Sequence, residues 1–151
     1  MSTTGETLPA NAVIVRPATP ADNGAVLALV GQLGHAVPVD ADRFSEAFTF
    51  ALSDEGRTAV FVADVEGAVE GYCLVTMTPL LYTNGLSAQL QEIVTAEDTR
   101  AKGVGTSLVR AVESLCEQMG VTQLTVASRR AGGFYDRLGY HEAAEYMRRL
   151  F

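Results

Sequence analysis

The stretch from Leu90 to Leu108 carries the residue types and the spacing that most clearly predict chemistry. It begins LQEIVT, a β-rich run, and ends RAKGVGTSL, where Gly103 and Gly105 lead into an amphipathic helix. The first N–H groups of a helix lack partners within it, and glycines let an anion approach the backbone closely. The helix dipole adds positive potential, as do Arg100 and Lys102. We therefore expect a phosphate or pyrophosphate site here, the alternative being a glycine turn that only begins an ordinary helix.

Two common phosphate-binding motifs do not fit this turn. A P-loop needs GxxxxGK[ST], which the sequence lacks, and the dinucleotide fingerprint GxGxxG fails because position 108 is Leu. The pattern Arg100-x-x-Gly103-x-Gly105 follows a Glu-Ile-Val strand and precedes a Leu/Val-rich helix. In this setting it resembles the acetyl-CoA signature of the GCN5-related N-acetyltransferase (GNAT) superfamily.

A second segment, residues 131–140, is similar to another motif of that superfamily. It reads AGGFYDRLGY and matches A-x-x-F-Y-x-x-x-G-[FY], with a helix and a strand between the two motifs. By itself the segment predicts a short helix in which Phe134 and Leu138 pack inward and Gly139 ends the helix. The two motifs together are far more specific than either one alone.

The resemblance implies which residues contact acetyl-CoA, and it implies no metal. The strand residues before the turn would contact the pantetheine arm, whose amides can pair with a strand edge that lacks a partner. The turn would wrap the pyrophosphate, and Ser128 stands where the family often has Asn. The expected cofactor-binding residues are Ile93, Val94, Thr95, Arg100, Ala101, Lys102, Gly103, Val104, Gly105, Thr106 and Ser128.

Acetyl transfer from a thioester to an amine requires two proton movements. The amine, with a reference pKa of about 10.4, must lose a proton before it attacks, and the leaving thiolate, with a thiol pKa of about 8.5, must be stabilised. The resemblance places Tyr135 beside the cofactor sulfur, where a phenol could donate a proton. The alternative is a half-buried tyrosine of the core.

Glu92 is the candidate base. It lies two residues before Val94 on the same strand and could accept the proton of the amine directly or through a water. Strand alternation predicts that Glu92 shares a face with Leu90 and Val94, and an acid on such a face is either paired or functional. The alternative is a carboxylate that faces solvent or pairs with an arginine.

The elements that position these residues follow from hydrophobic periodicity and turn residues. Strands are expected at residues 12–16, 58–64, 68–78, 87–95 and 121–127, and helices at 19–33, 40–52, 105–119 and 133–138. From Tyr140 onward there is room for one or two edge strands. This order predicts one α/β domain with a mixed sheet. The resemblance implies about six or seven strands, about four flanking helices and a splayed pair of parallel strands, with a bulge that would expose the strand edge.

Composition limits the class of protein. A chain of 151 residues that is 48% hydrophobic and 19% charged suits one globular domain, expected at residues 12–151 after a flexible tail at 1–11. The net charge of -7 argues against nucleic acid as a partner, and no apolar run reaches the roughly 18 residues of a membrane span. Two cysteines, Cys73 and Cys116, cannot form a disulfide framework, so a cytoplasmic setting is expected.

The uneven charge bears on the substrate. Residues 1–75 hold ten acidic residues against three basic ones, whereas residues 76–151 hold eight of each. The family usually builds the acceptor pocket from the first two helices, the loop between them and the segment around residues 78–86. Most of these parts lie in the acidic first half, so we expect a small-molecule or peptide amine that is cationic. Apolar residues there predict a partly apolar rim or, equally, a homodimer contact. They are Leu33, Val37, Phe44, Phe48, Leu80, Leu81 and Tyr82.

The leading hypothesis is an N-acetyltransferase that moves acetyl from acetyl-CoA to a primary amine by direct attack in a ternary complex. A non-catalytic acyl-CoA-binding or sensor domain is the alternative, and a structural protein with neither ligand is third. Tyr135 and Glu92 favour the enzyme, because a domain that only binds needs neither an acid nor a base.

Overall fold

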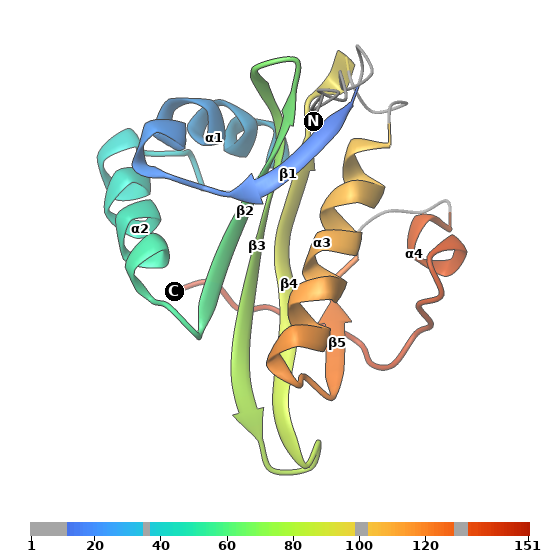
Figure 1. Cartoon of the computed structure of the whole chain (residues 1–151). Helices are drawn as coiled ribbons and strands as arrows, with labels where there is room; N and C mark the ends of the chain where they lie inside the picture. The colour runs from blue at the N-terminus through green and yellow to red at the C-terminus, as the bar shows by residue number, and fades with distance from the viewer. Residues whose placement is uncertain (1–11, 35–36, 99–102, 129–132) are drawn as a thin grey trace, which may run out of the picture.

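The computed structural model describes residues 12–34, 37–98, 103–128 and 133–151. Within them a five-stranded sheet lies between two layers of helices (Figure 1). The expected tail at residues 1–11 lies outside the described residues. The α/β class and the mixed sheet are confirmed.

The strands follow the order expected from the sequence. Each is antiparallel to the next except the last two, β4 and β5, which are parallel. The β2–β3 hairpin turns at Glu66 and Gly67, both with positive φ (54° and 86°), as a two-residue loop requires. The strands are β1 Val13–Pro17, β2 Thr58–Val65, β3 Ala68–Leu80, β4 Gly85–Thr95 and β5 Gln123–Val126.

The described residues form four α-helices, as expected. Helices α1 (Asn23–Val30) and α2 (Ala41–Ser53) cover one face of the sheet, and α3 (Val104–Met119) and α4 (Phe134–Arg137) lie on the other side (Figure 1). The helix expected at residues 19–33 is regular only in its middle, because short 3₁₀ turns flank α1. Two buried apolar clusters result, one on each face of the central strands.

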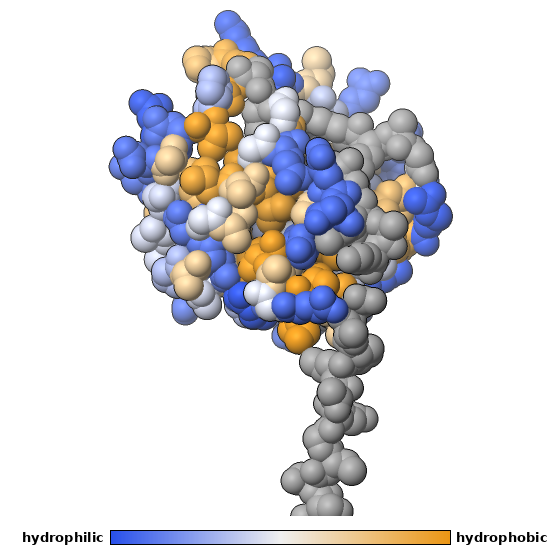
Figure 2. Space-filling model, turned by 90° about the horizontal axis from the view of Figure 1, so that it is seen from above, coloured by the Kyte–Doolittle hydropathy of each residue, from blue (hydrophilic) through white to orange (hydrophobic). Residues whose placement is uncertain are grey.

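Apolar side chains also reach the surface. Seen from above, hydrophobic residues gather near the middle of the molecule and are flanked by hydrophilic ones (Figure 2). The large apolar residues with the greatest exposure include Leu81 in the β3–β4 turn and Met147 and Phe151 near the C-terminus.

The strand count is lower than expected. The six or seven strands that the resemblance implied are five in the described part of the chain, because residues 141–151 form no strand there. This segment is exposed throughout and crosses to the side of α1 and α2 (Figure 1). The segment contains no Val, Ile or Thr, and its two Glu and two Ala residues are types depleted in strands.

Candidate active site

A bulge in β4 decides where the side chains of this strand point. Glu92 and Leu90 lie opposite two consecutive residues of β3, so the residue between them, Gln91, is extra. Leu90 consequently packs in the cluster under α3, whereas Val94 packs in the cluster under α1 and α2. Glu92 lies on the same face as Val94, and the expectation that Leu90 shares that face is wrong.

The strands β4 and β5 pair only along part of their length. Their parallel ladder runs from Ser87 opposite Gln123 to Leu90 opposite Val126, where β5 ends, while β4 continues to Thr95 beside β3. Beyond Leu90, among the described residues, no strand pairs with the outer edge of β4. The splayed parallel pair is therefore present, and the bulge lies where the two strands separate.

A small cavity of about 90 Å³ brings the two sequence motifs together. The end of β4, the start of α3 and the start of α4 all contribute to its wall. Six of the predicted site residues line it together with Phe134; they are Ile93, Thr95, Gly103, Gly105, Thr106 and Tyr135. The cavity thus joins residues that are up to 42 positions apart in the chain.

The two glycines of the turn have different structural roles. Gly103 precedes α3 in the left-handed conformation, with φ of 77°, which favours glycine. Gly105 lies within the first turn of α3, where positive φ is not needed. A Cβ atom there would lie 3.4 Å from the Phe134 ring and 3.7 Å from Thr95 Cγ2, so glycine lets α4 and β4 approach the start of α3.

Tyr135 lies in an aromatic cluster at this cavity. Its ring meets Phe134 edge-on at 5.0 Å and Tyr140 at 5.8 Å between centroids. Tyr140 is held in turn by a 2.7 Å hydrogen bond that its hydroxyl donates to Glu113 of α3. Phe134 and Leu138 pack toward the core, and Gly139 has φ of 93°, so the helix expected from this segment alone is confirmed.

The other predicted cofactor residues lie apart from the cavity or outside the described chain. The side chains of Val94 and Val104 are buried in the two apolar clusters, so only their backbones can reach a ligand. Ser128 is exposed just after β5. Arg100, Ala101 and Lys102 lie outside the described residues.

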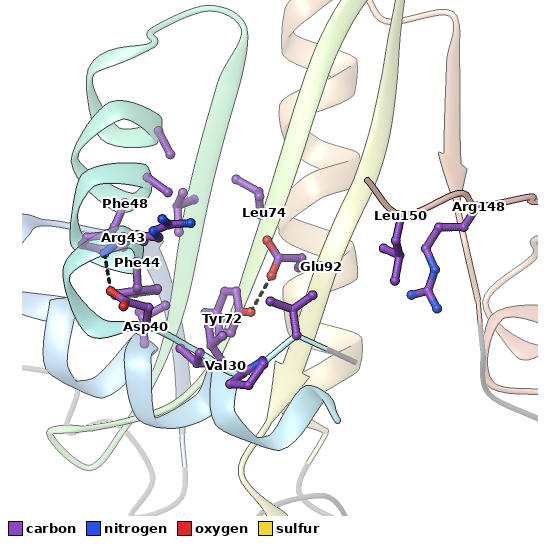
Figure 3. A pocket seen from close by; sticks show the side chains of 17 residues that line it. Val30, Asp40, Arg43, Phe44, Phe48, Tyr72, Leu74, Glu92, Arg148 and Leu150 are labelled. Carbon is purple, nitrogen blue, oxygen red and sulfur yellow. Dashed lines mark hydrogen bonds between the residues drawn. The ribbon is translucent and has the colours of Figure 1, made fainter. Parts of the chain in front are cut away.

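Glu92 lines a different and larger pocket, of about 440 Å³, on the other face of the sheet. Its Oε1 accepts a 3.0 Å hydrogen bond from the hydroxyl of Tyr72 on β3 (Figure 3). Tyr72 is 2% exposed, and burial, with the neighbouring Glu92 charge second, raises its pKa well above the usual value. The hydroxyl therefore stays protonated and keeps donating to Glu92.

Tyr72 was missed by the sequence analysis. It stands in a strand of apolar residues, and 20 positions separate it from Glu92. The hairpin of β2 and β3 and the order of β3 and β4 along the chain indicate that Tyr72 and Glu92 lie on neighbouring strands. They do not indicate that the two side chains meet, because the pairing register depends on the bulge. Of the expected rim, Val37, Phe44 and Phe48 line this pocket, whereas Leu33, Leu80, Leu81 and Tyr82 do not.

The two cysteines belong to the core, and the potential metal ligands among the described residues do not cluster. Cys73 and Cys116 are buried and unbonded, and burial raises the pKa of Cys73 to about 12, so neither serves as a nucleophile. In the described ranges no group of His, Cys, Asp or Glu is arranged to hold a metal ion. None of the helices described has the length and apolar character needed to cross a membrane.

Comparison with known families decides the classification. A family model described as an acetyltransferase (GNAT) domain matches residues 56–142. The chain belongs to the GNAT acetyltransferase family. Both motifs lie within the matched range, so the resemblance drawn from them is confirmed.

A curated relative of this GNAT chain agrees with that assignment. An N-acetyltransferase of Chlorobaculum tepidum, named as uncharacterised, is 35% identical over 82 residues, which are 54% of this chain and 49% of the relative. The chain thus spans about half the length of the curated relative that it matches.

Solved structures share the GNAT fold over nearly the whole chain. Glucosamine-6-phosphate N-acetyltransferase from Arabidopsis thaliana has a TM-score of 0.80 at 20% identity, covering 93% of this chain and 99% of that one. A transcriptional regulator from Bacillus halodurans C-125 has the same TM-score and identity, covering 93% and 100%. At such identities the likeness establishes the fold alone.

Proposed function

We propose that this GNAT chain is an N-acetyltransferase that moves acetyl from acetyl-CoA to a primary amine by direct attack in a ternary complex. The observation that carries the proposal is the convergence of both motifs on one cavity, beside a strand edge that has no partner strand in the described part of the chain. A non-catalytic acyl-CoA-binding domain would need that cavity, but it would not need Glu92 in a separate pocket.

The residues present fit acetyl-CoA. Gly103 in its left-handed conformation, Gly105 and Thr106 form one side of the cavity at the start of α3, where helix N–H groups favour an anionic pyrophosphate. Among the described residues, no strand pairs with the outer edge of β4 from Gln91 to Thr95, and this edge offers backbone groups to the amides of the pantetheine arm. When bound, acetyl-CoA supplies the acetyl thioester.

Tyr135 and Glu92 act from opposite faces of the sheet. Glu92 takes one proton from the ammonium group, and the freed nitrogen forms a bond to the acetyl carbon as the carbon–sulfur bond breaks. The nitrogen then loses its second proton to solvent, and Glu92 releases the proton that it took. Tyr135 gives a proton to the sulfur and regains one from solvent, or keeps its proton and hydrogen-bonds the thiolate. The splay between β4 and β5 supports this division, because it opens the sheet beside Glu92.

The acceptor side supports a cationic amine. Among the described residues, the acidic residues of the first half lie on or next to α1, α2, β2 and β3, and each of these elements contributes to the lining of the larger pocket that contains Glu92. A small-molecule or peptide amine in its ammonium form is attracted by this charge.

The test is thiol release from acetyl-CoA against a panel of amines. Tyr135→Phe and Glu92→Gln are each expected to lower kcat about 100-fold or more, the usual contribution of a general acid or base. Tyr146→Phe and Glu117→Gln, exposed residues outside both pockets, serve as matched controls.

Two results would count against the proposal. An unchanged kcat for Tyr135→Phe would remove its role as the acid. Thermal stabilisation by acetyl-CoA without turnover on any amine would favour the acyl-CoA-binding domain instead.

A further inference from the structure

The larger pocket, here called the acceptor chamber, is lined mostly by apolar side chains. It has a volume of about 440 Å³, is open to solvent on one side, and lies between α1, α2, the facing strands and the C-terminal residues Arg148 and Leu150. This volume suits a small ligand. Phe44 and Phe48 of α2 stack with ring centroids 5.6 Å apart and form one wall. Aliphatic side chains complete the chamber; they include Val26, Val30, Val60 and Leu74.

The polar groups of the chamber are few, and most are already engaged. The carboxylate of Asp40 caps α2 by accepting two 3.0 Å hydrogen bonds from backbone N–H groups. The hydroxyl of Tyr72 donates to Glu92. Arg43 and Arg148 are exposed at the rim, on opposite sides of the Tyr72–Glu92 pair (Figure 3). Among the described lining residues, Glu92 is therefore the charged group that faces the apolar interior.

A polar acceptor would bind poorly in such a chamber. Each buried hydroxyl or amine without a partner weakens binding by roughly five- to hundredfold. An apolar body gains instead from each methylene removed from water, by about threefold to fourfold. The chamber accordingly discriminates between amines by the polarity of the group attached to the nitrogen.

We propose that the acceptor is a primary amine with an apolar body, an alkyl or arylalkyl chain, whose ammonium group meets Glu92 and whose body lies among the valines and phenylalanines. This rests on the proposed acetyltransferase function and adds the substrate class. Polyamines, amino sugars and other amines with several polar groups are excluded from efficient turnover.

The experiment measures kcat/KM for a homologous series from butylamine to heptylamine, whose amine pKa values are nearly constant. We expect kcat/KM to rise about threefold to fourfold per methylene. Hexylamine is compared with 2-(2-aminoethoxy)ethanol, which has the same number of non-hydrogen atoms, and should be the better substrate by at least tenfold. Titration calorimetry of both amines into the protein saturated with CoA gives a readout independent of turnover.

A variant with a matched control tests the wall of the chamber. Phe44→Ala should lower kcat/KM for hexylamine about tenfold and should affect ethanolamine less. Phe50 lies on the same helix but is 68% exposed and is not part of the wall, so Phe50→Ala should leave both values unchanged.

The outcomes separate the two proposals. If polar amines are acetylated as well as hexylamine and the series is flat, the apolar substrate class is wrong and the acetyltransferase function stands. If no amine is acetylated although acetyl-CoA binds, the proposed function fails and the substrate class fails with it. A rising series with Phe44→Ala equal to the wild type would overturn the assignment of this wall.

Discussion

At the scale of single residues, the pair formed by Tyr72 and Glu92 is the feature that the fold adds to the sequence. A buried phenol whose pKa is raised remains a donor at every physiological pH, so it holds the carboxylate in one orientation. We treat Tyr72 as a positioning residue, because it acts on the amine only through Glu92.

Tyr72→Phe tests this role. Removing a hydrogen bond to a charged group corresponds to about 1.5–3 kcal/mol, so kcat should fall by at least tenfold. The KM for acetyl-CoA should not change, because the cofactor cavity lies on the other face of the sheet. Steady-state kinetics with both substrates varied separates the two constants, and a change confined to the KM for acetyl-CoA would contradict the assignment.

At the scale of elements, the contact between β3 and the first turn of α3 positions the turn that carries Gly103 and Gly105. Gly71 of β3 faces α3, and a Cβ atom there would lie 2.9 Å from Val104 Cγ1 and 3.2 Å from Leu108 Cδ1. The absence of a side chain thus allows the start of this helix to approach the sheet closely.

Gly71→Ala should therefore displace the start of α3. We expect the free energy of unfolding to fall by about 1–3 kcal/mol, as overpacking does, and acetyl-CoA to bind more weakly. Urea unfolding and the thermal shift produced by acetyl-CoA measure the two effects.

Gly24→Ala is the control for this substitution. Gly24 lies in α1, and an added Cβ atom would have no neighbouring atom within 4 Å outside the local helix backbone, so alanine should stabilise the protein by about 0.5–1 kcal/mol and leave the cofactor shift intact. A Gly71→Ala protein as stable as the wild type, with normal binding, would show that the close approach is not required.

At the scale of the whole molecule, a partly buried ion pair connects the first strand to the N-cap residue of the first helix. Arg16 of β1 donates hydrogen bonds of 2.8 and 3.0 Å to the carboxylate of Asp22, whose side chain is 7% exposed. The Arg16 hydrogen bond, together with the Thr19 N–H, lowers the pKa of Asp22 below its usual range. The ion pair therefore contributes to global stability while Asp22 is ionised.

The lowered pKa of Asp22 makes the contribution of the ion pair to stability decrease at low pH. Because the folded pKa is lowered, the contribution is complete above the unfolded pKa of about 3.9 and is lost as the pH falls through the folded value. Asp22→Asn should lower the free energy of unfolding by about 1–3 kcal/mol at pH 7, and its difference from the wild type should shrink below about pH 4.

Urea unfolding of both proteins between pH 7 and pH 3 measures that difference. The exposed Asp42→Asn should change stability by about 0.5 kcal/mol or less. A difference between Asp22→Asn and the wild type that is constant with pH would contradict the role of the ionised carboxylate.

The parts of the fold that the sequence predicts are those that depend on residues close together in the chain. Glycine and proline positions and apolar periodicity depend on neighbours a few residues away, so the hairpin at Glu66 and Gly67 and the helix after Gly103 could be expected. The edge strands expected after Tyr140 do not form at residues 141–151, and the lack of Val, Ile and Thr in that segment is a local signal against them.

The sequence by itself determined the α/β class, the two motifs and the family, because each of these rests on residue types at short spacings. Only the tertiary structure decided that Leu90 and Glu92 face opposite sides of the sheet, since one extra residue at Gln91 shifts the register. It also decided that Tyr72 holds Glu92 and that Tyr135 meets Gly103 in one cavity. These contacts join distant segments, and pairing register and packing, which are non-local, create them.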